Sequence, residues 1–111
     1  MVLGVSLGLM VASLPSEARQ NPSSPALSPT ELAGKKLFLQ RCSLCHLRPV
    51  GGPPGTYSYG PPLNGFVNER PQGAERVTNT VRRGTGRMPG FQYGLESAEI
   101  EAIVAYLKTM R

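Results

Sequence analysis

The sequence Cys42-Ser43-Leu44-Cys45-His46 holds two cysteines that are separated by two residues and followed at once by a histidine. Cys-x-x-Cys-His is the attachment signature of c-type haem. On one helical turn, two thiols at this spacing can each add to a vinyl group of the same porphyrin. The adjacent imidazole is then carried beneath the ring, where it can bind iron. The motif therefore predicts one haem c, attached through thioethers at Cys42 and Cys45 and ligated by His46.

Other uses of the cysteine pair fit the rest of the chain less well. A redox dithiol of the thioredoxin type would need alternating helices and strands, which the sequence pattern does not contain. Half a zinc site would need further ligands, but the chain has only 2 Cys and 1 His. A structural disulfide would be strained at this spacing. Haem attachment is the interpretation that we adopt.

A low-spin haem that transfers electrons needs a second axial ligand, and His46 is the only histidine. The methionine candidates are Met88 and Met110, since Met1 and Met10 precede the folded unit. Met110 lies at the end of the last predicted helix, where the chain frays. A lone methionine is more often core filler than a ligand, but the loop around Met88 favours ligation.

That loop reads Arg83-Gly84-Thr85-Gly86-Arg87-Met88-Pro89-Gly90-Phe91. Its glycines, Gly84, Gly86 and Gly90, let the backbone bend close to a ring. Pro89 favours an extended conformation at Met88, so that the thioether projects from a stiff loop. We therefore predict that the iron is bound by His46 and Met88.

Composition limits the architecture and leaves room for a buried cofactor. At 111 residues and 11.9 kDa the chain can form one domain, which excludes barrel enzymes and doubly wound folds. Its 13 Gly and 11 Pro predict long segments without regular structure, and only 6% of its residues are aromatic. A buried haem would supply the apolar surface that so few aromatic side chains cannot.

The N-terminal residues have the features of an export signal. Residues 1–14 are uncharged and mostly apolar, but too few for a membrane helix of about 20 residues. Ser16-Glu17-Ala18 places small residues where signal peptidase reads them, although no Lys or Arg precedes the apolar run. A buried N-terminal helix and an uncleaved anchor are the alternatives. We predict a signal peptide at 1–18, a flexible leader at 19–28 and one domain at 29–111. The protein would then be periplasmic, rather than in a thylakoid lumen or anchored, with no membrane span once processed.

The first predicted helix begins at Ser28-Pro29-Thr30-Glu31, where Ser28 and Glu31 can form a capping box. Its apolar face is expected to consist of Leu32, Ala33, Leu37 and Phe38. Between Leu47 and Gly73 no periodicity remains. So long a loop in a compact domain suggests a chain wrapped around something other than protein.

Two further helices are predicted in the second half of the chain. One spans Ala74–Arg83, buries Val77 and Val81 at positions i and i+4, and stops at Gly84. The last is capped by Ser97 and has acidic residues near its N-terminus and basic residues near its C-terminus. Its apolar stripe is formed by Ile100, Ile103, Val104 and Leu107.

With these motifs in place, the sequence from Gly34 to Lys108 resembles a class I cytochrome c. That family has a glycine and an aromatic residue four positions apart on its first helix, matched by Gly34 and Phe38. These cross the last helix at an aromatic residue, matched by Tyr106. The resemblance implies an all-α cytochrome c fold of three to four helices wrapped around one covalently attached haem, with long Pro/Gly-rich loops.

The segment Gly60-Pro61-Pro62-Leu63-Asn64-Gly65 is similar to a Gly-Pro-x-Leu segment of that family. By this match the Pro61 carbonyl would accept the proton on the second nitrogen of His46 and orient the ring. The chain departs from the family in having no Trp for a hydrogen bond to a haem propionate, and the insert at 56–59 has no assigned role. Candidates to replace that bond are Tyr57, Tyr59 and Arg70.

These expectations predict an electron-transfer protein rather than an enzyme. With both axial positions filled, no site remains for a substrate or for oxygen, and the protein would carry single electrons between redox partners. The alternative is a haem enzyme or gas sensor in which Met88 leaves the sixth position open. A third possibility is a cytochrome that acts only as a subunit of a larger oxidase complex.

The basic surplus predicts partners with acidic docking patches, since the formal net charge is +5. Several basic residues flank the attachment motif and the loop around Met88: Lys35, Lys36, Arg41, Arg48, Arg82, Arg83 and Arg87. Clustered about a haem edge, they would steer the protein to a periplasmic dehydrogenase as donor and to an oxidase or another cytochrome as acceptor. A solvated basic surface without this role is the alternative. No nucleic-acid partner is expected, because the chain has no reading motif.

Overall fold

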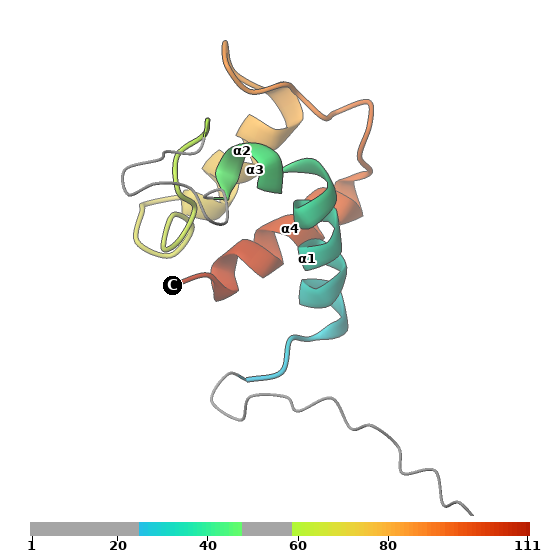
Figure 1. The fold of residues 1–111 in the computed structure, drawn as a ribbon, viewed down its shortest axis with the longest axis vertical. Coiled ribbons are helices and arrows are strands. Elements are labelled where there is room, and N and C mark those ends of the chain that lie inside the picture. The colour runs from blue at the N-terminus through green and yellow to red at the C-terminus, as the bar shows by residue number, and fades with distance from the viewer. Residues whose placement is uncertain (1–24, 48–58) are drawn as a thin grey trace, which may run out of the picture.

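The computed structural model describes residues 25–47 and 59–111; the predicted signal peptide, most of the leader, Arg48 and Tyr57 lie outside them. In these two ranges the chain forms helices and no strand (Figure 1). The helices are α1 (Pro29–Arg41), α2 (Ser43–His46), α3 (Gly73–Arg83) and α4 (Ser97–Thr109). The all-α fold class expected from the sequence is thereby confirmed. None of these helices is long and apolar enough to cross a membrane.

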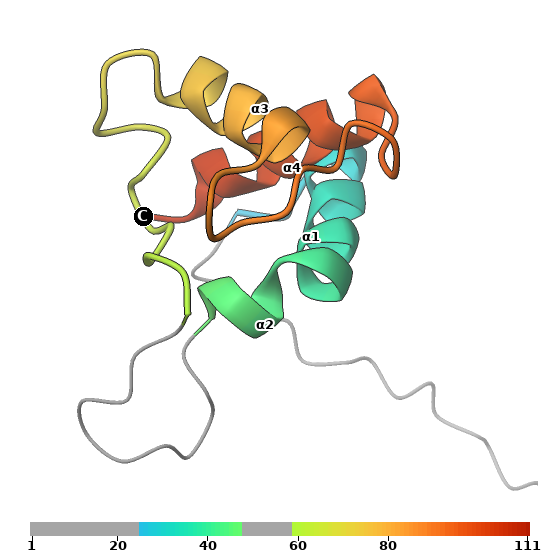
Figure 2. The same cartoon turned by 90° about the horizontal axis from the view of Figure 1, so that it is seen from above.

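The most extensive contact between helices is the crossing of α1 and α4, which Figures 1 and 2 show. A Cβ on Gly34 would overlap the carbonyl group of Ala102, so the two backbones can approach this closely only because residue 34 has no side chain. One turn further along α1, the Phe38 ring contacts the Tyr106 ring with centroids 5.5 Å apart and planes tilted by 54°. The helix contact predicted through these residues is confirmed.

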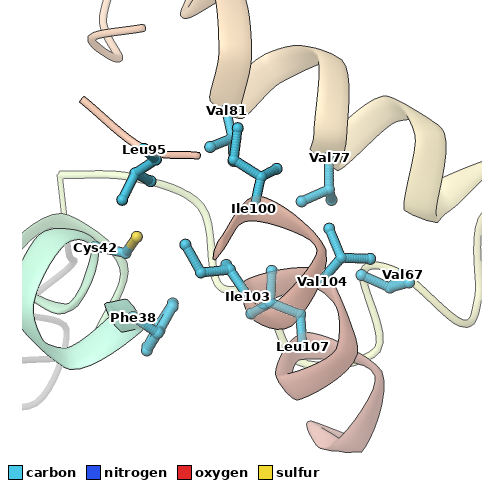
Figure 3. Close-up of a cluster of buried hydrophobic side chains, with 10 residues drawn as sticks. All are labelled: Phe38, Cys42, Val67, Val77, Val81, Leu95, Ile100, Ile103, Val104 and Leu107. Carbon is cyan, nitrogen blue, oxygen red and sulfur yellow. The ribbon is translucent and has the colours of Figure 1, made fainter. Parts of the chain in front are cut away.

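The apolar core lies between α1, α3 and α4 (Figure 3). Phe38, Ile100 and Ile103 are at most 1% exposed. The predicted apolar stripe of α4 and the predicted valine pair of α3 are both buried here. The members of the core are Phe38, Cys42, Val67, Val77, Val81, Leu95, Ile100, Ile103, Val104 and Leu107.

The apolar face predicted for α1 is wrong in part. Leu32 and Ala33 are exposed, whereas Gly34 and Phe38 are the buried positions of this helix. The contact with α4 is centred on Gly34, and on a helix the residue four positions later lies on the same side. This contact turns Leu32 and Ala33 outward, although their hydrophobicity alone placed them inside.

The cap predicted for α4 is also displaced by one residue. Glu96 is the N-cap, and its backbone N–H donates to the Glu99 carboxylate at 2.8 Å. The carboxylate satisfies a donor that the helix itself cannot, and its charge suits the positive end of the helix dipole. Ser97 is the first residue of the helix, and its hydroxyl accepts a hydrogen bond from Arg82 at 3.2 Å.

Part of the segment that precedes α3, residues 64–68, is hydrogen-bonded to the end of α4. Asn68 donates through its side chain to the Lys108 carbonyl at 2.8 Å, and Asn64 donates to the Arg111 carbonyl at 3.1 Å. The Gly65 N–H donates to the Met110 carbonyl at 2.9 Å. These bonds satisfy C-terminal carbonyls that have no partner within the helix. Residues 59–72, the described part of the predicted irregular loop, form no helix or strand, as predicted, but these bonds hold them in one place.

Gly34→Ala is expected to lower the free energy of unfolding by about 1–3 kcal/mol, because α1 and α4 must separate to admit a methyl group. This loss is a net value, because the cost of separating the helices must also exceed the roughly 1 kcal/mol by which alanine is favoured over glycine in a helix. Denaturant unfolding of the haem-containing protein measures the difference. Ala33→Leu, at the exposed neighbouring position, is the control and should change the value by less than about 0.5 kcal/mol. A Gly34→Ala protein as stable as the wild type would contradict the close crossing.

Candidate functional site

The cysteine motif forms one helical turn at the end of α1. The Cys42 N–H continues the hydrogen bonding of α1 by donating to the Phe38 carbonyl at 2.8 Å. The N–H groups of Cys45 and His46 then both donate to the Cys42 carbonyl, at 3.1 and 3.0 Å. The geometry on which the prediction of two thioethers depends, two cysteines on a single turn, is therefore present.

This turn borders a cavity of about 380 Å³, a volume within the range of cofactor sites in proteins. Every site residue predicted from the sequence lines the cavity: Cys42, Cys45, His46, Pro61 and Met88. The remaining wall is mostly apolar and consists of Phe38, Leu63, Phe66, Val77, Val81, Pro89, Phe91, Ile103 and Leu107, with Arg41, Tyr59, Gly60, Thr80, Thr85 and Arg87 as further members. The cavity thus lies beside the core drawn in Figure 3 and shares part of its side chains.

The two thiols lie in different surroundings. Cys42 is buried and Cys45 is exposed. Burial raises the pKa of the Cys42 thiol, and the neighbouring Cys45 raises it further. Cys42 is therefore a neutral thiol at pH 7. Figure 3 shows its sulfur on the side of α1 that faces Ile103 of α4, in apolar surroundings that suit an uncharged thioether.

His46 is held by the backbone of the segment that follows the motif. Its Nδ1 lies 2.9 Å from the Pro61 carbonyl oxygen. Because a carbonyl oxygen only accepts, Nδ1 must carry the proton, which leaves the Nε2 lone pair free to bind a metal. The segment is fixed in turn, since the Gly60 N–H donates to the Cys45 carbonyl at 2.6 Å.

Gly60 lies against the imidazole, where a side chain would not fit. A Cβ at this position would be 2.6 Å from His46 Cε1 and 2.7 Å from His46 Nδ1. The sequence shows this glycine only as part of a family-like segment. The need for a glycine at this position follows from the packing of residue 60 against His46, which lies 14 positions earlier in the chain.

Met88 and Met110 differ in their positions relative to the cavity. Met88 is half-buried, packs against the core and lines the cavity. Met110 also packs against the core but is not among the lining residues, and it lies at the C-terminal end of α4. Of the two candidates, Met88 is the one that lines the cavity beside the cysteine motif.

The glycines of the Met88 loop do not all serve the same purpose. Gly84 ends α3 with φ at +73°, in the left-handed region, and a Cβ there would lie 2.5 Å from the Met88 carbonyl oxygen. A Cβ on Gly90 would lie 2.8 Å from the Arg83 carbonyl oxygen. At Gly86, by contrast, no described protein atom lies within 4 Å of where a Cβ would stand. Close packing within the chain therefore requires two of the three predicted glycines.

The three residues predicted as possible hydrogen-bond donors to a haem propionate differ in their position relative to the cavity. Tyr59 borders the cavity while being 94% exposed, and Tyr57 lies outside the described residues. Arg70 does not line the cavity, but its guanidinium lies 4.2 Å from the centre of the Phe66 ring, which does. Sequence reasoning missed Thr80 and Thr85, two threonines that line the cavity. The only signal for Thr85 was its place in the Met88 loop.

The residues present fit a haem. The cavity offers two thiols for vinyl addition, an imidazole with a free Nε2, a thioether and a largely apolar wall. Within 25–47 and 59–111, no three His, Cys, Asp or Glu side chains are placed so that they could hold a metal ion among themselves. The soft thioether and the imidazole are a known pair of haem ligands, in cytochromes c.

Comparison with protein families gives an independent result. The family model described as cytochrome c oxidase, cbb3-type, subunit III matches residues 29–107. The matched range contains the attachment motif, the Pro61 segment and the Met88 loop, and it ends in the last turns of α4. It therefore spans the cavity and all of its described walls. On this evidence the protein belongs to the family of cytochrome c oxidase, cbb3-type, subunit III, and its folded unit is a c-type cytochrome domain.

Proposed function

We propose that the protein is an exported monohaem cytochrome that carries single electrons between redox partners. Its haem is attached through thioethers at Cys42 and Cys45, and its iron is bound by His46 and Met88. The observation that carries the proposal is that all four side chains line one cavity. When bound, the haem supplies an iron that alternates between the ferric and ferrous states and so carries one electron.

The polypeptide positions two different side chains, His46 and Met88, as ligands of the iron. The Pro61 carbonyl keeps the proton of His46 on Nδ1, so that Nε2 is available and the ring cannot rotate freely. Met88 contributes a soft sulfur, which favours ferrous iron and raises the reduction potential. Because neither ligand must be exchanged between the two redox states, the protein needs little rearrangement when an electron arrives or leaves.

Gly60→Ala is expected to disturb His46, because the added Cβ would overlap the imidazole ring. We expect the free energy of unfolding to fall by about 1–3 kcal/mol, the usual range for overpacking, and the reduction potential to shift. Denaturant unfolding and redox titration of the haem-containing protein measure both. Pro62→Ala, two positions further along the same exposed segment, is the control. Wild-type values for Gly60→Ala would show that the ring is not confined by this segment.

Carbon monoxide distinguishes electron transfer from the alternative of a haem enzyme or gas sensor. If Met88 occupies the sixth position, the ferrous wild-type protein should bind carbon monoxide slowly or not at all, and redox titration should give a single one-electron transition. Rapid carbon monoxide binding, together with high-spin ferric iron, would support the enzyme or sensor instead. Absorption spectroscopy records both outcomes on the same sample.

A second candidate function is that of a subunit within an oxidase complex. It is supported by the printed name of the matched family, which refers to subunit III of a cbb3-type oxidase. A free carrier should be recovered from cells as a monomer, whereas a subunit should copurify with an integral membrane complex. The chemistry proposed for the haem is the same in both cases, so this comparison tests the assembly alone.

Basic residues near the cavity support docking to acidic partners. Arg41 and Arg87 are exposed and border the cavity itself. We expect the rate of electron transfer to an acidic redox protein to fall as salt is added, since the attraction between exposed charges is screened. At low salt, the double variant Arg41→Gln, Arg87→Gln should react roughly three- to tenfold more slowly. Arg76→Gln, which removes an exposed charge from α3 away from the cavity, is the control. A rate indifferent to salt would contradict this docking mode.

Export is proposed from the N-terminal sequence alone. The apolar run and the small residues before Arg19 support cleavage after Ala18. Covalent attachment of the haem also suits a compartment outside the cell's haem supply. The mass of the purified haem-containing protein tests this proposal, with Arg19 as the expected first residue and retention of residues 1–18 as the contrary result.

A further inference from the structure

The loop that carries Met88 is closed at its base onto the end of α3. The Phe91 N–H donates to the Val81 carbonyl at 2.8 Å, and the Gln92 N–H donates to the Arg82 carbonyl at 3.2 Å. These are among the C-terminal carbonyls that the helix itself leaves without partners. The two ends of the loop are therefore fixed to one helix. The position of Met88, near the tip, then depends on bonds made within the loop.

Within the loop, both backbone polar groups of Met88 are bonded to one residue. The Thr85 N–H donates to the Met88 carbonyl at 2.8 Å. In the opposite direction, the Met88 N–H donates to the Thr85 hydroxyl oxygen at 3.1 Å, and the Arg87 N–H donates to the same oxygen at 3.3 Å. The residues on either side of Thr85 are glycines, Gly84 and Gly86, which have no side chain to take over this role.

A methionine ligand needs such support more than most ligands do. Its side chain is unbranched and has three rotatable bonds, so the thioether sulfur can occupy many positions. A well-defined backbone conformation at the methionine limits those positions. Pro89 restricts the backbone of Met88 on the C-terminal side. On the N-terminal side, the hydroxyl of Thr85 is the only side-chain group bonded to the Met88 N–H among the described residues.

We propose that Thr85 is a positioning residue for the sulfur of Met88. The proposal rests on the proposed function, in which Met88 is the sixth ligand of the iron. Thr85 does not bind the iron. It closes a short turn on Met88 that keeps the thioether directed into the cavity, and this turn favours rebinding of the sulfur over its replacement by another ligand.

Competition by imidazole for the ferric iron tests the proposal. Thr85→Val keeps the shape of the side chain and removes the hydroxyl acceptor. Since one hydrogen bond contributes about 0.5–1.5 kcal/mol, the apparent affinity for imidazole should rise roughly two- to thirteenfold. Thr85→Ser, which retains the hydroxyl, should bind imidazole as the wild type does. Thr85→Ala is the second variant without a hydroxyl, for use should the valine protein not mature.

The matched control is Thr78→Val. The Thr78 hydroxyl donates to the Ala74 carbonyl at 2.9 Å within α3, away from the cavity, so this variant also removes one threonine hydrogen bond. It should leave imidazole affinity unchanged whatever it does to stability. Wild-type affinity in Thr85→Val, equal affinities in the valine and serine variants, or the same rise in Thr78→Val would each overturn the positioning role.

The failure of the proposed function would look different. If Met88 is not the ligand, Met88→Ala will bind imidazole with the same affinity as the wild type. If Met88 is the ligand but Thr85 does not position it, Met88→Ala will bind far more tightly while Thr85→Val matches the wild type. The two results are distinguished by measuring all the variants in one series.

Discussion

Met88→Ala is expected to abolish the weak far-red absorption band that marks sulfur bound to ferric haem iron. Among the described residues, Met88 is the only methionine that lines the cavity. Alanine has no side-chain atom that could bind the iron in its place. The ferrous variant should bind carbon monoxide readily, which the wild type should not. Its reduction potential should also fall, because the soft ligand that favours ferrous iron is lost.

Met110→Ala is the matched control for this experiment. It removes the same type of side chain from another partly buried position, one that packs against the core but does not line the cavity. We expect it to lower stability while leaving the far-red band and the reduction potential in place. Persistence of the band in Met88→Ala, or its loss in Met110→Ala, would reverse the assignment of the sixth ligand.

The second large effect is expected when both cysteines are replaced. In Cys42→Ala, Cys45→Ala the haem has no covalent bond to the chain, so acid acetone should extract all of the pigment. Each single variant should keep its haem through one remaining thioether. The double variant should also unfold far more easily, because haem that dissociates no longer stabilises the folded state by mass action.

The wild-type protein is the reference for both cysteines. Its pigment should stay with the polypeptide through acid acetone and through denaturing electrophoresis. A double variant that retains its haem under these conditions would show that another side chain forms the covalent bond. Loss of all haem from only one of the single variants would assign the attachment to that cysteine alone.

The parts of the fold that were predicted correctly are those encoded over short distances in the sequence. Val77 and Val81 are one turn apart on α3, and the spacing of the apolar residues of α4 is enough to identify its buried side. The haem attachment motif occupies a single turn, and its chemistry depends only on residue types and spacing. The resemblance to class I cytochrome c added the crossing at Gly34.

Most errors and omissions concern residues whose exposure or hydrogen-bond partners depend on a distant part of the chain. Leu32 is apolar, but the position of α4 turns it outward, and nothing within α1 encodes that position. Asn64 and Asn68 bond to carbonyl groups 47 and 40 residues away, so their role cannot be recognised from neighbouring residues. The cap of α4 is the exception, because its signal is local: Glu99 lies three residues after Glu96 and accepts from the Glu96 N–H, whereas the residue three positions after Ser97 is Ile100, which has no carboxylate.

In the candidate site, too, some residues could be predicted from local sequence and others could not. Cys42, Cys45 and His46 were identified from the motif, and the resemblance singled out Pro61, whose carbonyl does lie at hydrogen-bond distance from His46. A backbone carbonyl has no side-chain signature, so the residues alone would not have identified it. The choice between Met88 and Met110 rested on loop composition, whereas the cavity separates them by position.

Anomalous diffraction at the iron absorption edge, from crystals of the haem-containing protein, tests the central proposal most directly. The expected result is a single iron peak within bonding distance of His46 Nε2 and Met88 Sδ, with continuous electron density from Cys42 and Cys45 to the porphyrin. An iron bound by only one of these side chains, or a porphyrin without bonds to the two sulfurs, would contradict it.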